Sequence, residues 1–292
     1  MLASERHGSG EPLVLVHGVT HRRQAWYPVL DRLTDQREVI LVDLPGHGES
    51  PDLDLRGRSV DDTLRAEFQA FLADQGLERP HVAGNSLGGL IALSAGAEGD
   101  ARSVTALSPA GFWENTRQFG YTRQIFEQAC AVSARLGSRT ELLARTRAGR
   151  TVMYGTLVAH PGRVSPDQAR GDVRAFLRAR KALRVLLDAA SPFEREISPD
   201  VPVTIAWAAR DLVLPLWQAQ VARRRLPHAE HLTLRGVGHV PMTDKPTLVA
   251  DILLQGSAAA ADAAHFADTV DIASLLPAHT AAATPSTEAV WA

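Results

Sequence analysis

The stretch that decides the fold is Gly84-Asn85-Ser86-Leu87-Gly88. A short apolar run before it, His81-Val82-Ala83, favours a strand, and the apolar run from Leu90 to Ala95 behind it favours a helix. Strand, Gly-x-Ser-x-Gly and helix in this order predict a nucleophile elbow, in which a serine stands at the tip of a strained turn that needs glycines on either side. Alone, the pentapeptide is weak evidence, because Gly and Ser are common and an ordinary glycine turn explains it better, so its meaning depends on partners elsewhere in the chain.

The composition is that of an ordinary globular protein, with 45% hydrophobic and 22% charged residues in a chain of 292. The formal net charge of −2 gives no reason to expect nucleic acid or a membrane surface as a partner. No run approaches the roughly 20 apolar residues that a membrane span needs, and Met1 to His7 lack the apolar core of a secretory signal. The one cysteine, Cys130, cannot form an internal disulfide. We therefore expect a cytoplasmic protein.

Apolar runs typical of strands buried on both faces recur along the chain. They lie at residues 13–16, 39–42, 81–83, 104–107, 203–207 and 231–234. Helical patterns separate them, and Ser59 with Asp62 three residues later resembles a capping box at the start of one helix. The last helix is expected to start near Asp244, whose carboxylate suits an N-cap ahead of Lys245 and Pro246. This alternation predicts an α/β fold with a mostly parallel sheet flanked by helices.

The rhythm of the sequence changes between about residue 112 and residue 198. No strand run appears there, several helical segments follow one another, and 15 basic residues stand against 8 acidic ones. We therefore expect residues 112–198 to form a helical insertion between two strands, with residues 1–111 and 199–256 as the two parts of one core. Residues 257–292 are rich in Ala, Thr, Ser and Pro and are expected to form a mobile tail, with one docked helix near residues 266–276.

An activated serine needs an imidazole to take its proton and a carboxylate to orient that imidazole. Asp211 follows the strand expected at 203–207, and His239 follows the strand expected at 231–234. Loops after parallel strands converge on one edge of the sheet, where ligands bind in open α/β folds. We therefore expect Ser86, Asp211 and His239 to form a catalytic triad, with Glu114 as an alternative position for the acid.

These motifs together resemble the motif set of the α/β-hydrolase superfamily. The resemblance covers roughly residues 11–110 and 201–255 and rests on His17-Gly18, the run from Asp43 to Ser50, the elbow from Gly84 to Gly89, Asp211 with Pro215, and Gly238-His239. It implies the α/β-hydrolase fold, with the insertion as a helical cap, or lid.

The resemblance also implies roles for single residues. The backbone N–H groups of Val19 and Leu87 would form an oxyanion hole, which stabilises the tetrahedral intermediate, while His17 and Asp43 would fix loops. Members of the family usually begin with an antiparallel strand pair. Only about ten residues precede Glu11 here, so we expect a truncated N-terminal edge hairpin or a true start further upstream.

The function that this reading predicts is a cofactor-free serine hydrolase, without a metal, that cleaves a carboxylic ester, lactone or thioester of a small acyl substrate. Ser86 would attack the carbonyl with His239 as base and form an acyl-enzyme. A carbon–carbon bond hydrolase or lyase on the same triad and a non-catalytic ligand-binding protein of the same fold remain as alternatives, and the oligomeric state stays open. Candidates for an apolar substrate pocket, for which core packing is an equal explanation, are Phe112, Trp113, Phe119, Tyr154, Val213, Leu214 and Val240.

Overall fold

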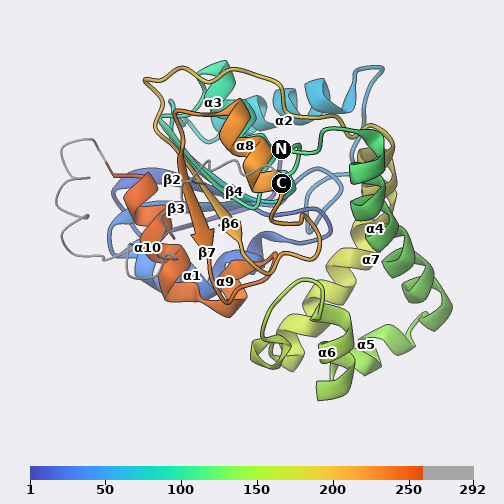
Figure 1. The fold of residues 1–292 in the computed structure, drawn as a ribbon. Helices are drawn as coiled ribbons and strands as arrows, with labels where there is room; N and C mark the ends of the chain where they lie inside the picture. The colour runs from blue at the N-terminus through green and yellow to red at the C-terminus, as the bar shows by residue number, and fades with distance from the viewer. Residues whose placement is uncertain (259–292) are drawn as a thin grey trace, which may run out of the picture.

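The computed structural model describes residues 1–258, which form a sheet of seven strands flanked by helices (Figure 1). The strands follow the order β1-β3-β2-β4-β5-β6-β7 across the sheet, and every neighbouring pair except β1 with β3 is parallel. Their bounds are β1 Ser4–His7, β2 Glu11–Val16, β3 Arg37–Val42, β4 His81–Asn85, β5 Ser103–Leu107, β6 Val203–Ala208 and β7 Glu230–Leu234. This is the mostly parallel α/β sheet that the sequence predicts.

Helices cover both faces of the sheet, because alternate residues along each strand point to opposite sides. One core packs α2, α3 and α8 against side chains such as Val14 and Ile40, and the other packs α1 and α10 against neighbours such as Leu13 and Val39. The helices of these two layers and their short companions are η1 Arg23–Trp26, α1 Tyr27–Thr34, α2 Val60–Asp74, α3 Leu87–Glu98, α8 Gln218–Arg225, α9 Pro241–Asp244 and α10 Pro246–Gly256.

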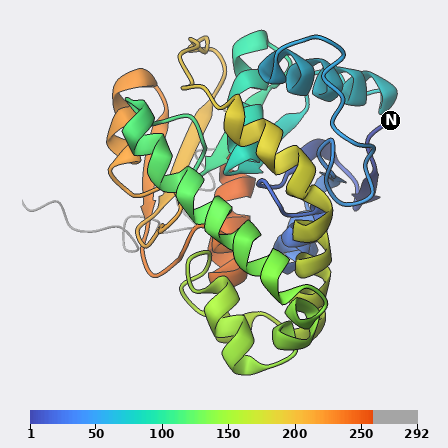
Figure 2. The same cartoon turned by 90° about the vertical axis from the view of Figure 1, so that its right-hand side faces the viewer.

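A run of further helices lies between β5 and β6 and contains no strand within the described part of the chain. These are α4 Thr116–Leu136, α5 Arg139–Ala144, α6 Arg147–Tyr154, η2 Pro161–Arg163 and α7 Pro166–Asp188. Figure 2 shows the two long helices, α4 in green and α7 in yellow, passing in front of the strands rather than joining either helical layer. The insertion therefore occupies a side of the molecule that the two helical layers leave uncovered.

The N-terminal edge of the sheet holds one short antiparallel strand. β1 pairs with β3 from Ser4↔Val42 to His7↔Val39, and the chain then turns through Gly8 and Gly10, both at positive φ, into β2. One edge strand is thus present where the family pattern led us to expect the remnant of a pair.

Local signals at two helix starts have different outcomes. Ser59 caps α2 as expected, since its side chain accepts a hydrogen bond from the Asp62 N–H. The expectation that Asp244 caps the last helix is wrong: Lys245 stands at the N-cap of α10, and the Asp244 carboxylate bonds instead to backbone groups outside that helix. The expected tail and its helix lie outside the described residues, apart from residues 257 and 258. None of the helices within residues 1–258 has the length and apolar character needed to cross a membrane.

Candidate active site

Ser86 stands at the turn between β4 and α3 in a conformation that is rare for a residue with a side chain. Its φ is 57° and its ψ is −117°. The turn is tight enough that a Cβ on Gly84 would overlap the carbonyl of Gly88, and a Cβ on Gly88 would overlap the carbonyl of Val16. Two glycines are therefore required on sterical grounds, which is the geometry that a nucleophile elbow demands.

Asp211 and His239 form a buried hydrogen-bonded pair on the loops that follow β6 and β7. Asp211 Oδ2 lies 2.7 Å from His239 Nδ1, and both residues are at most 5% exposed. The other carboxylate oxygen, Oδ1, accepts the backbone N–H groups of Val213 at 2.9 Å and Leu214 at 2.7 Å. Because both oxygens act as acceptors, His239 donates from Nδ1, which leaves Nε2 as the nitrogen able to accept a proton.

A side chain beside Ser86 connects the serine turn to the histidine loop. Asn85 Nδ2 donates to the carbonyl of His239 at 2.9 Å and to that of Leu107 at 3.0 Å. Among the described residues no hydrogen bond joins the Ser86 hydroxyl to the His239 ring. Asn85 thus brings the serine turn and the histidine loop together, although the Ser86 hydroxyl and the His239 ring are not hydrogen-bonded. Such bonds are often long in an enzyme without substrate and shorten when substrate binds.

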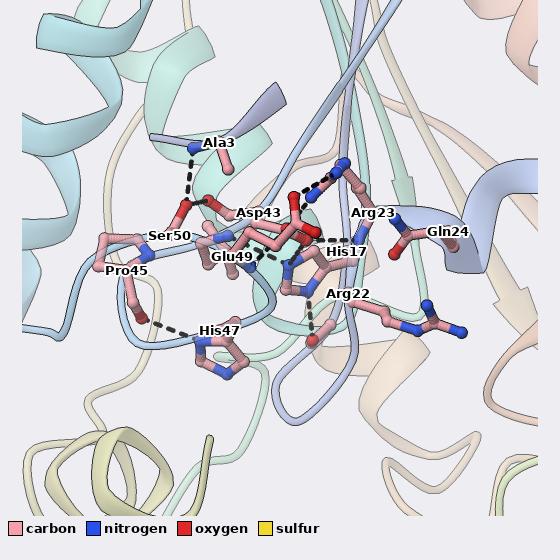
Figure 3. A network of polar contacts seen from close by, with 12 residues as sticks. Ala3, His17, Arg22, Arg23, Gln24, Asp43, Pro45, His47, Glu49 and Ser50 are labelled. Carbon is pink, nitrogen blue, oxygen red and sulfur yellow. Dashed lines mark hydrogen bonds and ion pairs between the residues drawn. The ribbon is translucent and has the colours of Figure 1, made fainter. Parts of the chain in front are cut away.

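The loop that follows β2 is held in place by a buried polar network (Figure 3), and it lies beside Ser86. His17 Nδ1 donates to the Gly18 carbonyl at 2.8 Å, and His17 Nε2 accepts the Leu44 N–H at 3.1 Å. Burial of the ring holds the pKa of His17 well below its usual value, so the ring is neutral. A Cβ on Gly18 would lie 3.1 Å from the Cβ of Ser86, which shows how closely the loop approaches the serine.

Asp43 ties the far end of the same loop to the loop after β3. Its carboxylate accepts the Arg23 N–H at 2.7 Å and the Glu49 N–H at 3.0 Å, and it also pairs with the Arg23 guanidinium. That guanidinium reaches Glu5 at 2.6 Å as well, so β1 is part of the network. Both His17 and Asp43 thus contact loop groups, and Val19 lies on the loop that they hold.

An apolar pocket opens beside Ser86, and its empty space amounts to about 720 Å³ including the mouth. Val19 and Leu87, the candidates for the oxyanion hole, line it together with four of the seven candidate substrate-binding residues, Trp113, Phe119, Val213 and Leu214. The rings of Trp113 and Phe119 pack against each other at a tilt, with centroids 4.6 Å apart. Most of the remaining wall consists of apolar side chains from α2, α3, α4 and α7, namely Val60, Leu64, Leu90, Phe126, Leu183, Leu186 and Leu187.

The other three candidate pocket residues lie elsewhere. Phe112 is fully buried and packs its ring against Phe193 and Trp207, each with its centroid 6.0 Å away. The Tyr154 hydroxyl donates to Asp172 at 2.8 Å within the inserted helices. Val240 belongs to the core on the α1 and α10 face of the sheet, so core packing accounts for it better than substrate contact does.

Glu114, the alternative acid, is engaged at the surface. Its carboxylate pairs with Arg224 on α8, and its side chain is 48% exposed. The wall residues from α2 and α7 could not be singled out from the sequence, since Leu64 and Leu183 repeat at helical spacing in the same way as core residues do. Only the packing of the inserted helices across the strand edge distinguishes them.

Comparison with known proteins places this geometry in a family. A sequence model described as "Alpha/beta hydrolase family" matches residues 13–252. A dihydrolipoyllysine-residue acetyltransferase component of an acetoin cleaving system from Pseudomonas putida is 28% identical over 79% of this chain, and the match spans 59% of that longer protein. A pimeloyl-[acyl-carrier protein] methyl ester esterase from Xanthomonas campestris pv. campestris is 29% identical over 84% of this chain and 94% of its own length.

Solved structures agree on the fold. A thermophilic esterase from Thermogutta terrifontis superposes with a TM-score of 0.65 at 21% identity, over 85% of this chain and 90% of the other. Likeness at that level of identity speaks for the fold alone, whereas the family match spans most of the chain. The chain therefore belongs to the alpha/beta hydrolase family.

Proposed function

We propose that this protein is a cofactor-free serine hydrolase that cleaves a carboxylic ester with an apolar acyl part through an acyl-enzyme. The observation that carries the proposal is the 2.7 Å bond between Asp211 and His239 on loops tied by Asn85 to the strained turn of Ser86. A serine, an oriented imidazole and a buried carboxylate on one sheet edge are the parts that acyl transfer needs.

The proposed reaction begins when His239 Nε2 takes the proton of the Ser86 hydroxyl, whose oxygen attacks the ester carbonyl. The backbone N–H groups of Val19 and Leu87 stabilise the negative oxygen of the tetrahedral intermediate. His239 then gives the proton to the leaving alcohol, and a water molecule activated by the same ring releases the acid from the acyl-enzyme. Asp211 stabilises the imidazolium that forms in each half of the cycle.

The pocket supports an acyl group that is largely hydrocarbon. Its wall is mainly Leu, Val, Phe and Trp side chains, and burying such a chain removes apolar surface from water. Because α4 and α7 supply part of this wall, we propose that residues 112–198 act as a cap that selects the substrate and excludes water, over a core formed by residues 1–111 and 199–256. The Xanthomonas relative is named as a methyl ester esterase, which favours an ester over other acyl bonds.

The experiment that tests the proposal is active-site labelling with a small fluorophosphonate, read by intact mass spectrometry. Wild-type protein is expected to gain one label and Ser86→Ala protein none. A panel of p-nitrophenyl esters of rising acyl length, with lactones beside them, then gives the substrate class. Wild-type protein that folds but neither labels nor hydrolyses any member of the panel would contradict the proposal.

A further inference from the structure

The Asp244 carboxylate is fully buried and accepts backbone N–H groups from two separate parts of the chain. Its Oδ2 accepts from Gly238 and from Ala159, each at 2.8 Å, and its Oδ1 accepts from His160 at 2.8 Å. The His160 ring adds a contact of 3.2 Å to Oδ1. Hydrogen bonds to an ionised acceptor are stronger than neutral ones, so this carboxylate is a firm junction.

The two segments joined by Asp244 are the histidine loop and the inserted helices. Gly238 precedes His239 directly, whereas Ala159 and His160 lie between α6 and η2. The segments are in close contact, because a Cβ on Gly238 would lie 2.8 Å from the carbonyl oxygen of Leu157. A second bond crosses the same contact, from the Val240 N–H to the Leu157 carbonyl at 2.9 Å.

The backbone around His239 is therefore held on each side. Asp244 holds the N–H of Gly238 before it, Leu157 holds the N–H of Val240 after it, and Asn85 holds the carbonyl of His239 itself. Asp211 orients the ring but makes none of these backbone contacts. The position of the imidazole thus depends on groups from the inserted helices as well as on its hydrogen-bonded acid.

We propose that Asp244 is a positioning residue for His239, and that it makes the docking of residues 157–160 a condition for a correctly placed base. The proposal rests on the proposed function, because it assigns the base of that reaction to His239. The inserted helices then contribute to the chemical step and not only to the shape of the pocket.

The test compares Asp244→Asn with wild-type protein by two readouts, the rate of fluorophosphonate labelling and the steady-state kinetics on a short and a long ester. The asparagine amide has one oxygen, and its NH₂ group replaces the second acceptor with a donor. The variant therefore loses either the bond from His160 to Oδ1 or the bonds from Gly238 and Ala159 to Oδ2. We expect labelling and kcat to fall on the order of 10²-fold for both esters, with KM nearly unchanged, since a misplacement of about 1 Å can have that effect.

Two further variants keep the test decisive. His160→Ala removes the ring contact and keeps the three backbone N–H bonds to the carboxylate, so it is expected to slow labelling less than Asp244→Asn does. Gly238→Ala leaves the Asp244 carboxylate intact but forces the histidine loop away from Leu157, so it is expected to show the same loss of labelling and kcat. It decides the test if Asp244→Asn does not fold.

Two outcomes would overturn the proposal while leaving the proposed function standing. One is wild-type labelling in folded Asp244→Asn with a raised KM for the long ester alone, which would mean that Asp244 only holds the cap. The other is wild-type labelling in folded Gly238→Ala. Wild-type protein that does not label would instead reject the proposed function, and this proposal with it.

Discussion

Replacing Asp211 by asparagine should change the proton on His239 rather than the fold. Two backbone N–H groups, from Val213 and Leu214, already point at Oδ1, so the oxygen of an asparagine must stay there to accept them. The amide NH₂ then faces His239 Nδ1, where a carboxylate oxygen accepts at 2.7 Å in the native protein. Nδ1 must now accept, and the proton moves to Nε2.

An imidazole protonated at Nε2 cannot take the proton of Ser86. In a comparable triad this change lowers kcat by about 10⁴, which corresponds to about 5 kcal/mol of barrier. The assay is steady-state hydrolysis of a p-nitrophenyl ester by wild-type, Asp211→Asn and Glu114→Gln proteins, with thermal melting as the control for folding. Glu114→Gln should be nearly silent, because within residues 1–258 this carboxylate pairs with Arg224 alone, at the surface. A loss below tenfold in Asp211→Asn, or a larger loss in Glu114→Gln, would refute the reasoning.

Substitutions at three more positions have expected outcomes. Ser86→Ala should lower turnover by a factor on the order of 10⁶. Ser86→Gly should melt at a higher temperature than Ser86→Ala, because glycine relieves the strain of a φ of 57°, which costs about 1–3 kcal/mol. Equal melting temperatures of the two variants would argue against strain at this position. Phe119→Ala should raise kcat/KM for longer over shorter acyl esters by about tenfold, since it opens the pocket wall, while fluorophosphonate labelling persists. Burial lowers the pKa of His47 to about 4, and the unfolded chain binds that proton from about pH 6.5 downwards. The free energy of unfolding should thus fall by about 2 kcal/mol more between pH 7 and pH 5 in wild type than in His47→Gln, measured by urea titration.

The sheet and the places of Ser86, Asp211 and His239 along its edge could be predicted because each depends on a short local pattern. A buried parallel strand is a continuous apolar run, and the loop after it lies at a known edge, so Asp211 and His239 could be placed together from the strands before them. The steric need for Gly84 and Gly88 is local in the same way.

Residues whose roles depend on distant partners could not be predicted. In the sequence, Asp244 resembles an N-cap because Lys245 and Pro246 follow it. The backbone N–H groups that donate to its carboxylate belong to Ala159 and His160, which lie 85 and 84 residues earlier in the chain. Phe112 and Phe119 are alike in sequence, but one packs in the core against Trp207 and the other lines the pocket. Hydrophobic periodicity identifies a buried side chain without saying what buries it.

The order in which the strands are connected affects when the proposed triad can assemble during synthesis. β5 and β6 pair directly although the chain between Leu107 and Val203 carries all the inserted helices, and β7, which pairs with β6, comes later still in the chain. Pairing across so long a segment slows folding, because the chain must close the loop before the contacts form. A chain still emerging from the ribosome thus carries the serine turn for some time without Asp211 or His239. The proposed triad is complete only once β6 and β7 have both paired, because Asp211 and His239 lie on the loops that follow these strands.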